Sequence, residues 1–261
     1  MIRPLREREP PPRQAVVKTT ILARVREAVA HTRSLRSPSL IAGPPGIGKT
    51  ISLEHIAATD EDAVLIRFAT RYRTINGIYK ALLEVTEWPT YHKHGYDLEH
   101  AAEACAQHLV RYGGIVLLDE YQNFDLNAIR ALLGLYDQFK LPIVFAGNKE
   151  RMMRAGADAH TYEQISTRIA KRVTLTSPTR ADIEAIGVEY NVEGREAFDA
   201  MVAFTLQTSL RQLVQMLDAA RQVRGKRGSL RLEHLEAGHD HLNDGGRPSA
   251  TLISFAPGAV A

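Results

Sequence analysis

Cysteine is almost missing from this chain of 261 residues, in which Cys105 is the only one. An intramolecular disulfide needs two cysteines, so no such bond can stabilise the fold, and this fits a protein of the reducing cytoplasm. Because Cys105 lies in a run with helical apolar spacing, we expect it to be a buried structural thiol.

Long hydrophobic runs are missing as well. No apolar stretch is long enough to cross a bilayer, and no apolar segment follows the N-terminal arginines as it would in a secretory signal. The sequence therefore predicts no membrane partner. Neither sign of charge is in large excess, since 33 Lys and Arg against 30 Asp and Glu leave a net charge of +3. This balance permits nucleic-acid binding without demanding it.

Several catalytic arrangements are also absent from the sequence. No Ser/His/Asp or Cys/His arrangement for nucleophilic catalysis is readable, and no acidic triad for metal-dependent strand transfer. His92 with His94, and His239 with His241, form H-x-H pairs, but no further ligand follows at the spacing of a metal site. The sequence therefore predicts no structural zinc.

Short apolar segments typical of strands alternate with segments of helical spacing over the first two thirds of the chain. The predicted strands are 40–42, 63–68, 115–118, 141–146 and 173–175. The predicted helices are 16–33, 51–58, 75–85, 98–112, 126–139 and 162–172. This alternation predicts an α/β fold in which helices cover a parallel sheet.

The character of the sequence changes near Pro178, after which the apolar periodicity is helical only. The predicted helices there are 181–190, 195–204, 209–223 and 232–238. We therefore expect a small all-α lid domain after the α/β domain. The predicted division is a disordered basic, proline-rich arm (1–14), the α/β domain (15–177), the helical domain (178–242) and a flexible tail (243–261).

One loop of the α/β domain matches the phosphate-loop pattern G-x-x-x-x-G-K-[ST] between a predicted strand and a predicted helix. Its backbone N–H groups and the start of the helix would hold phosphate oxygens. Lys49 would reach the β- and γ-phosphates of ATP, and the Thr50 hydroxyl would bind Mg²⁺. The candidate residues are Gly43, Pro44, Pro45, Gly46, Ile47, Gly48, Lys49, Thr50 and Ile51.

Polar residues follow two later predicted strands, 115–118 and 141–146, whose carboxyl ends should lie beside the phosphate loop. Asp119 and Glu120 come directly after the apolar run 115–118. Asp119 would bind Mg²⁺ and Glu120 would act as general base for an attacking water. Asn148 follows the strand 141–146 and could orient that water, although a simple turn asparagine is the alternative.

In this order, the motifs resemble those of the AAA+ ATPases. Within that superfamily the chain looks most similar to the DNA-transposition ATPases, the group of phage Mu B, TnsC, TniB and IstB. The resemblance implies that Asn148 is sensor 1 and Arg211 is sensor 2, which contacts phosphate in the same subunit. It also implies that Arg168 or Arg172 is an arginine finger supplied to a neighbouring subunit, the alternative being a solvated helix face.

The resemblance further implies a function and its partners. ATP with Mg²⁺ would favour a homo-oligomer, a ring or helical filament, on duplex DNA of any sequence, and the assembly would stimulate a cognate transposase. Such a protein acts in the cytoplasm of a bacterial or phage-infected cell, on the nucleoid. The Mu B protein carries an N-terminal helix-turn-helix domain, whereas only some fifteen residues precede the first predicted helix here. The two alternatives are a natural short form, like TniB or IstB, and a truncated chain, and in either case DNA contacts of that domain do not carry over to these residues. A replication initiator or helicase loader and a small-molecule phosphotransferase remain alternative functions.

Two basic clusters are candidate DNA contacts. The first could contact phosphates through cations and hydroxyls, with Tyr72 stacking or simply packing, or it could be an ordinary charged surface loop. The first cluster comprises Arg67, Thr70, Arg71, Arg73, Thr74 and Lys80. The second could bind phosphate or an acidic partner, or be a solvated turn, and comprises Arg221, Arg224, Lys226, Arg227 and Arg231.

Overall fold

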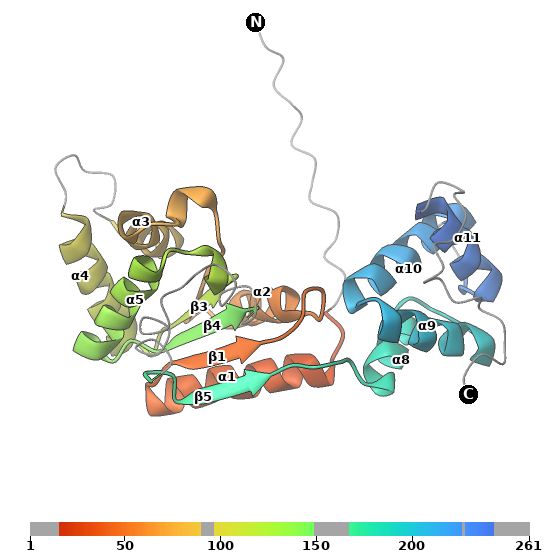
Figure 1. The fold of residues 1–261 in the computed structure, drawn as a ribbon, viewed down its shortest axis with the longest axis horizontal. Helices are drawn as coiled ribbons and strands as arrows, with labels where there is room; N and C mark the ends of the chain where they lie inside the picture. The colour runs from red at the N-terminus through yellow and green to blue at the C-terminus, as the bar shows by residue number, and fades with distance from the viewer. Residues whose placement is uncertain (1–15, 90–96, 149–166, 226–227, 243–261) are drawn as a thin grey trace, which may run out of the picture.

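A parallel sheet of five strands forms the centre of the computed structural model, which describes residues 16–89, 97–148, 167–225 and 228–242 (Figure 1). The strand order is β2-β3-β4-β1-β5, and every neighbouring pair is parallel. The strands are β1 (Ser39–Ala42), β2 (Ala63–Ile66), β3 (Ile115–Asp119), β4 (Ile143–Gly147) and β5 (Lys171–Thr174).

Helices cover both faces of the sheet, so its central strands β1, β3 and β4 are buried and mostly apolar. Alternate residues of β3 enter different cores: Ile115 and Leu117 pack towards α1 (Thr20–Leu35) and α2 (Lys49–Thr59), whereas Val116 and Leu118 pack on the other side. The second face is covered by α3 (Ile75–Val85), α4 (Leu98–Arg111) and α5 (Leu126–Phe139). The predicted α/β fold is confirmed.

The remaining described helices lie together beyond the C-terminal ends of the strands (Figure 1). They are α8 (Arg180–Glu189), α9 (Arg195–Gln207), α10 (Leu210–Arg224) and α11 (Leu232–Leu242). Their apolar faces are continuous with the core under α1, since Ile183, Leu213 and Leu235 belong to the same buried cluster as Val25. The helical part therefore packs directly against the α/β part.

Asp182 links the first helix of the chain to the start of this helical part. Its carboxylate accepts hydrogen bonds from the backbone N–H of Thr20 at 2.6 Å and from the Thr20 hydroxyl at 2.7 Å. The backbone N–H and the hydroxyl of Thr179 donate to it at 2.9 Å, completing a capping box at the start of α8. Burial alone would raise the pKa of Asp182, but these hydrogen bonds outweigh it and the pKa is lowered.

One predicted helix is wrong in the part that can be compared. Residues 162–166 lie outside the described residues, but 167–168 form a turn and Lys171 already begins β5. The spacing of Arg168, Lys171 and Arg172 imitates one face of a helix. The backbone instead completes a parallel ladder with β1, in which Arg172 pairs with Leu40.

Two short 3₁₀ helices, η1 (Thr70–Tyr72) and η2 (Tyr121–Asn123), were not predicted.

The prediction for Cys105 can be compared with the structure. Cys105 is 1% exposed and lies on α4, where its Sγ is 3.3 Å from the Thr86 hydroxyl. The predicted burial of Cys105 is confirmed, and this burial raises the pKa of the thiol. Within the described ranges, no helix combines the length and apolar character needed to cross a bilayer, and no group of three or more His, Cys, Asp and Glu could hold a metal ion. His92 and His94 lie outside those ranges.

Candidate nucleotide site

The predicted phosphate loop connects β1 to α2, as its sequence context indicated. Gly46 and Gly48 have φ values of +77° and +105°, a region that side-chain-bearing residues rarely adopt. The N–H of Gly43 donates to the carbonyl oxygen of Gly147 at 3.2 Å, which ties the start of the loop to the end of β4. Since α2 begins at Lys49, the loop ends at a helix N-terminus suited to bind anions.

The side chain of Lys49 lies over this loop and is 6% exposed. Its ammonium donates to the carbonyl oxygens of Gly43 and Pro44, both at 2.8 Å. Burial lowers the pKa of Lys49, against the opposing effect of the Glu120 and Asp119 carboxylates. Both acidic side chains therefore lie close enough to this cation to influence its charge, as a shared site requires.

Thr50 and Asp119, the two candidate magnesium ligands, are in direct contact. The Thr50 hydroxyl donates to Oδ2 of Asp119 at 2.7 Å. The second oxygen of Asp119, Oδ1, is buried and makes no hydrogen bond in the described part of the chain. Burial raises the pKa of this carboxyl group, partly offset by the hydrogen bond from Thr50. A hydroxyl and a buried carboxylate with an open oxygen are suitable ligands for Mg²⁺, so the residues fit this ion.

Glu120 and Asn148 directly follow the neighbouring strands β3 and β4, and Gln122 connects them. Glu120 adopts a left-handed backbone conformation with φ of +54°. Its carboxylate accepts hydrogen bonds from the side-chain amides of Gln122 and Asn123. The Gln122 Oε1 accepts the backbone N–H of Asn148 at 3.0 Å. Sequence reasoning missed Gln122, because nothing marks it except its position two residues after Glu120.

Arg211 lies where α10 begins, directly against the phosphate loop. The Arg211 backbone N–H donates to the carbonyl oxygen of Gly46 at 3.1 Å. A Cβ added at Gly46 would come within 2.8 Å of the Ser209 hydroxyl, so the start of α10 touches the loop backbone. The Arg211 charge contributes to lowering the pKa of Lys49. The structure thus brings Arg211 to the site, as predicted.

The two candidate finger arginines belong to β5 and to the turn that precedes it. Arg168 precedes β5 and pairs with Asp137, near the end of α5, at 2.9 Å. Arg172 is exposed within β5. The phosphate loop begins after Ala42, the last residue of β1, whereas Arg168 lies before the first residue of the parallel strand β5. Arg168 therefore lies at the end of β5 remote from the phosphate loop, whereas Arg172 lies within the strand, opposite Leu40 of β1.

The arginines of the first basic cluster are each paired with a carboxylate. Arg67 pairs with Glu54, Arg71 with Glu84 at 3.2 Å, and Arg73 with Asp125 at 2.7 Å. The cluster follows β2 and so begins at the C-terminal end of that strand, and the phosphate loop likewise follows the C-terminal end of β1. Thr70 is the first residue of η1, and the Thr74 hydroxyl caps α3 by accepting the backbone N–H of Gly77. Lys80 is exposed on α3. Tyr72, next to the cluster, is buried beneath Arg71.

The second basic cluster is partly engaged within the helical part. Arg221 stacks over the ring of Tyr190 at 4.0 Å and donates to the Glu189 carbonyl oxygen at 3.0 Å. Arg231 is 4.0 Å from Glu193. Lys226 and Arg227 lie outside the described residues. The stacking and carbonyl contacts give Arg221 a role in packing rather than in a free basic surface.

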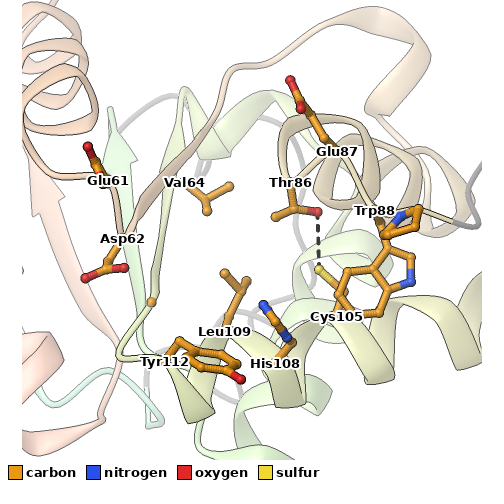
Figure 2. A pocket seen from close by; sticks show the side chains of 12 residues that line it. Glu61, Asp62, Val64, Thr86, Glu87, Trp88, Cys105, His108, Leu109 and Tyr112 are labelled. Atoms are coloured by element: carbon orange, nitrogen blue, oxygen red, sulfur yellow. Dashed lines mark hydrogen bonds between the residues drawn. The ribbon is translucent and has the colours of Figure 1, made fainter.

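A separate cavity of about 750 Å³ lies near the N-terminal ends of β2 and β3 (Figure 2). Asp62, just before β2, and Gly114, just before β3, contribute to its wall, together with the aromatic residues Trp88, His108 and Tyr112. The phosphate loop lies instead at the C-terminal ends of the strands. The cavity therefore belongs to no part of the candidate nucleotide site.

Comparison with known proteins agrees with this geometry. A family model described as an AAA domain matches residues 32–153, which contain the phosphate loop and the acidic strand end. Two solved structures share the fold: the Aeropyrum pernix ORC2 protein in its ADPNP-ADP complexes (TM-score 0.61, 16% identity, 87% of this chain and 67% of that one) and the A. pernix ORC1 protein in complex with DNA (TM-score 0.62, 15% identity, 89% and 68%). The fold is that of an AAA+ ATPase.

Curated relatives of this chain are named for DNA transposition and target DNA activation. The ATP-dependent target DNA activator B of Escherichia phage Mu is 21% identical over 197 residues, which are 73% of this chain and 60% of the relative. The Mu-like prophage FluMu DNA transposition protein B of Haemophilus influenzae is 19% identical over 196 residues, 73% of this chain and 67% of the relative. The chain thus spans less than two thirds of the phage Mu relative. The resemblance to transposition-type AAA+ ATPases is confirmed.

Proposed function

We propose that this chain is an ATP-dependent, DNA-binding regulator of DNA transposition that assembles on target duplex DNA and delivers it to a transposase. The contact between Thr50 and Asp119 below the phosphate loop carries the nucleotide part of this proposal. The names of the curated relatives, a target DNA activator and a transposition protein, support the DNA part. The phosphate loop, the acidic strand end and Arg211 act together in one chain.

The chemistry assigned to the site is hydrolysis of ATP to ADP and phosphate. The loop N–H groups and Lys49 bind the phosphates, and Mg²⁺ held by Thr50 and Asp119 neutralises their charge when bound. Glu120 accepts a proton from a water molecule whose oxygen attacks the γ-phosphorus. The bond from that phosphorus to the bridging oxygen of ADP breaks, and Asn148 orients the water.

Assembly couples ATP binding to DNA binding. Arg168 or Arg172 of one subunit reaches the ATP of the next, so charge on the transferring phosphoryl group is neutralised only when subunits meet. Because ATP binds more tightly to the assembled form, it shifts the equilibrium towards assembly. Hydrolysis of the ATP loosens the assembly and releases the DNA. The basic cluster after β2 contacts DNA phosphates. Arg71 and Arg73 then pair with phosphates in place of Glu84 and Asp125.

Two alternative functions are less well supported. The fold shared with ORC proteins, at 15–16% identity, carries no functional weight towards replication. The curated relatives that align over 73% of this chain favour transposition instead. A phosphotransferase acting on a small molecule would need an acceptor pocket and no arginine finger, so activity as a monomer, unaffected by DNA, would support that function instead.

Electron microscopy with a non-hydrolysing variant tests the proposal. Glu120→Gln should bind ATP and form rings or filaments on duplex DNA that persist, whereas wild-type assemblies should disassemble as ATP is consumed. Strand transfer by the cognate transposase into the bound DNA should be stimulated by wild-type protein with ATP. Monomeric protein under all conditions, with ATP turnover indifferent to DNA, would exclude this function.

A further inference from the structure

Gln122 joins two residues that follow neighbouring strands of the sheet. Its Nε2 donates to a carboxylate oxygen of Glu120, and its Oε1 accepts the backbone N–H of Asn148 at 3.0 Å. Glu120 follows β3 and Asn148 follows β4, two strands that pair in register up to Asp119 and Ala146. A single side chain therefore connects the candidate general base to the strand end that carries the candidate water-orienting residue.

The residue type at position 122 matches these two partners. A carboxylate needs a donor and a backbone N–H needs an acceptor, and a primary amide offers both from one planar group. The partners also determine which way the amide points, because the reverse orientation would leave both unsatisfied. A glutamate at this position could still accept from Asn148 but could not donate to Glu120.

The adjacent glycine leaves room for this side chain. A Cβ added at Gly147 would overlap Oε1 of Gln122 and approach Cδ1 of Tyr121 to 2.7 Å. Gly147 ends β4 and is not among the glycines with positive φ, so its backbone conformation does not require a glycine. The close approach of Gln122 is the physical reason for glycine here.

We propose that Gln122 is a positioning residue for ATP hydrolysis, one that holds the Glu120 carboxylate in line with the end of β4. The inference rests on the proposed function, in which Glu120 takes a proton from water. A general base is effective only within hydrogen-bond reach of that water, and a small displacement is costly. Asn123 contributes a longer hydrogen bond to the same carboxylate at 3.4 Å, so Gln122 is the main restraint.

Steady-state kinetics of Gln122→Leu and Gln122→Glu test this role. Gln122→Leu keeps the size of the side chain but cannot hydrogen-bond, so kcat should fall about 10- to 100-fold while KM and the Kd for ATP stay within about twofold. Gln122→Glu places a second carboxylate beside Glu120. This variant can still accept the N–H of Asn148 but repels the Glu120 carboxylate instead of holding it, so kcat should fall at least as far as in Gln122→Leu while the Kd for ATP again stays within about twofold. Gln107→Leu, exposed on α4, is the matched control.

The outcomes separate this inference from the function it rests on. Unchanged kcat in Gln122→Leu or in Gln122→Glu overturns the positioning role. Loss of ATP binding and of thermal stability in both variants also overturns it, in favour of a structural role. Glu120→Gln is measured in the same assay. If it hydrolyses ATP normally, the proposed function fails, whereas its inactivity beside active Gln122 variants refutes only the role of Gln122.

Discussion

The hydroxyl of Thr50 donates a hydrogen bond to Asp119, 69 positions further along the chain, at 2.7 Å. Thr50 belongs to the helix after β1 and Asp119 ends β3, with β4 between the two strands. The carboxyl ends of parallel strands open on one edge of a sheet, and ligands of such folds bind there. This contact therefore joins two separate sequence motifs into one site.

Removing the Lys49 ammonium should abolish nucleotide binding. Lys49→Ala deletes a buried cation that faces the loop, and without its charge-assisted hydrogen bonds ATP binding should weaken by about 100-fold or more. Isothermal titration calorimetry with ATP and Mg²⁺ measures this directly. Lys18→Ala, an exposed lysine before α1, is the control and should bind as wild type does. Equal affinity in Lys49→Ala would contradict the assignment of the loop.

Neutralising Asp119 should stabilise the isolated protein and remove its response to magnesium. Because burial raises the pKa of Asp119 above 3.8 in the folded state, the stability linked to this group falls as pH rises through the folded pKa. Asp119→Asn should therefore raise Tm at pH 7 by about 2–4 °C, with the gain disappearing at acidic pH. Thermal scans across pH, with and without Mg²⁺ and nucleotide, measure both effects. A lower Tm at pH 7 would contradict the prediction.

The Asp182 carboxylate should be needed to hold α1 and α8 together. Asp182→Ala leaves donors of Thr20 and Thr179 without their acceptor and should cost about 2–3 kcal/mol of unfolding free energy. Because the folded pKa is lowered, the stabilisation is present at neutral pH and lost as pH falls through that pKa. Urea denaturation at pH 7 and pH 3 measures this, with exposed Asp240→Ala as control. Equal stabilities at pH 7 would refute the role of Asp182.

The arginines after β2 should contribute to DNA binding without sequence preference. Arg71→Ala combined with Arg73→Ala should weaken binding to every duplex tested and reduce the salt slope by up to about 1.8, or about 0.9 for each DNA phosphate that is no longer neutralised. Their ion pairs are largely exposed, so folding should be unaffected. Fluorescence anisotropy over a range of salt concentrations measures the slope, with Arg195→Ala on α9 as control. An unaltered slope would place the DNA surface elsewhere.

Mixing variants should identify the arginine finger. Arg168→Ala and Arg172→Ala each retain their own nucleotide site, so both should bind ATP. The variant that lacks the finger should hydrolyse ATP slowly, and adding Glu120→Gln subunits should restore turnover, because these supply the arginine to an intact Glu120. ATPase assays of the mixtures measure this recovery. Full activity in both single variants would refute both assignments.

The fold could be predicted from the sequence wherever the pattern was local. Continuous apolar runs such as 115–118 predicted strands buried on both faces, and all five predicted strands lie within two residues of the observed bounds. The helix expected over 162–172 was wrong for its described end, because the spacing of Arg168, Lys171 and Arg172 is compatible with a helix. Only pairing with β1, which is distant in sequence, decided for a strand.

By itself, the sequence determined the chemistry of the candidate site: the glycines of the loop, Lys49, Thr50 and the acids after β3 follow from residue type and spacing. Tertiary structure decided how they are connected. It brought Arg211 onto Gly46, left Oδ1 of Asp119 open, and laid Gln122 between Glu120 and Asn148. The reason is physical. A motif shows which chemical groups are present, but the contacts between these groups depend on strand pairing and register. Strands distant in the sequence become neighbours only in the folded sheet.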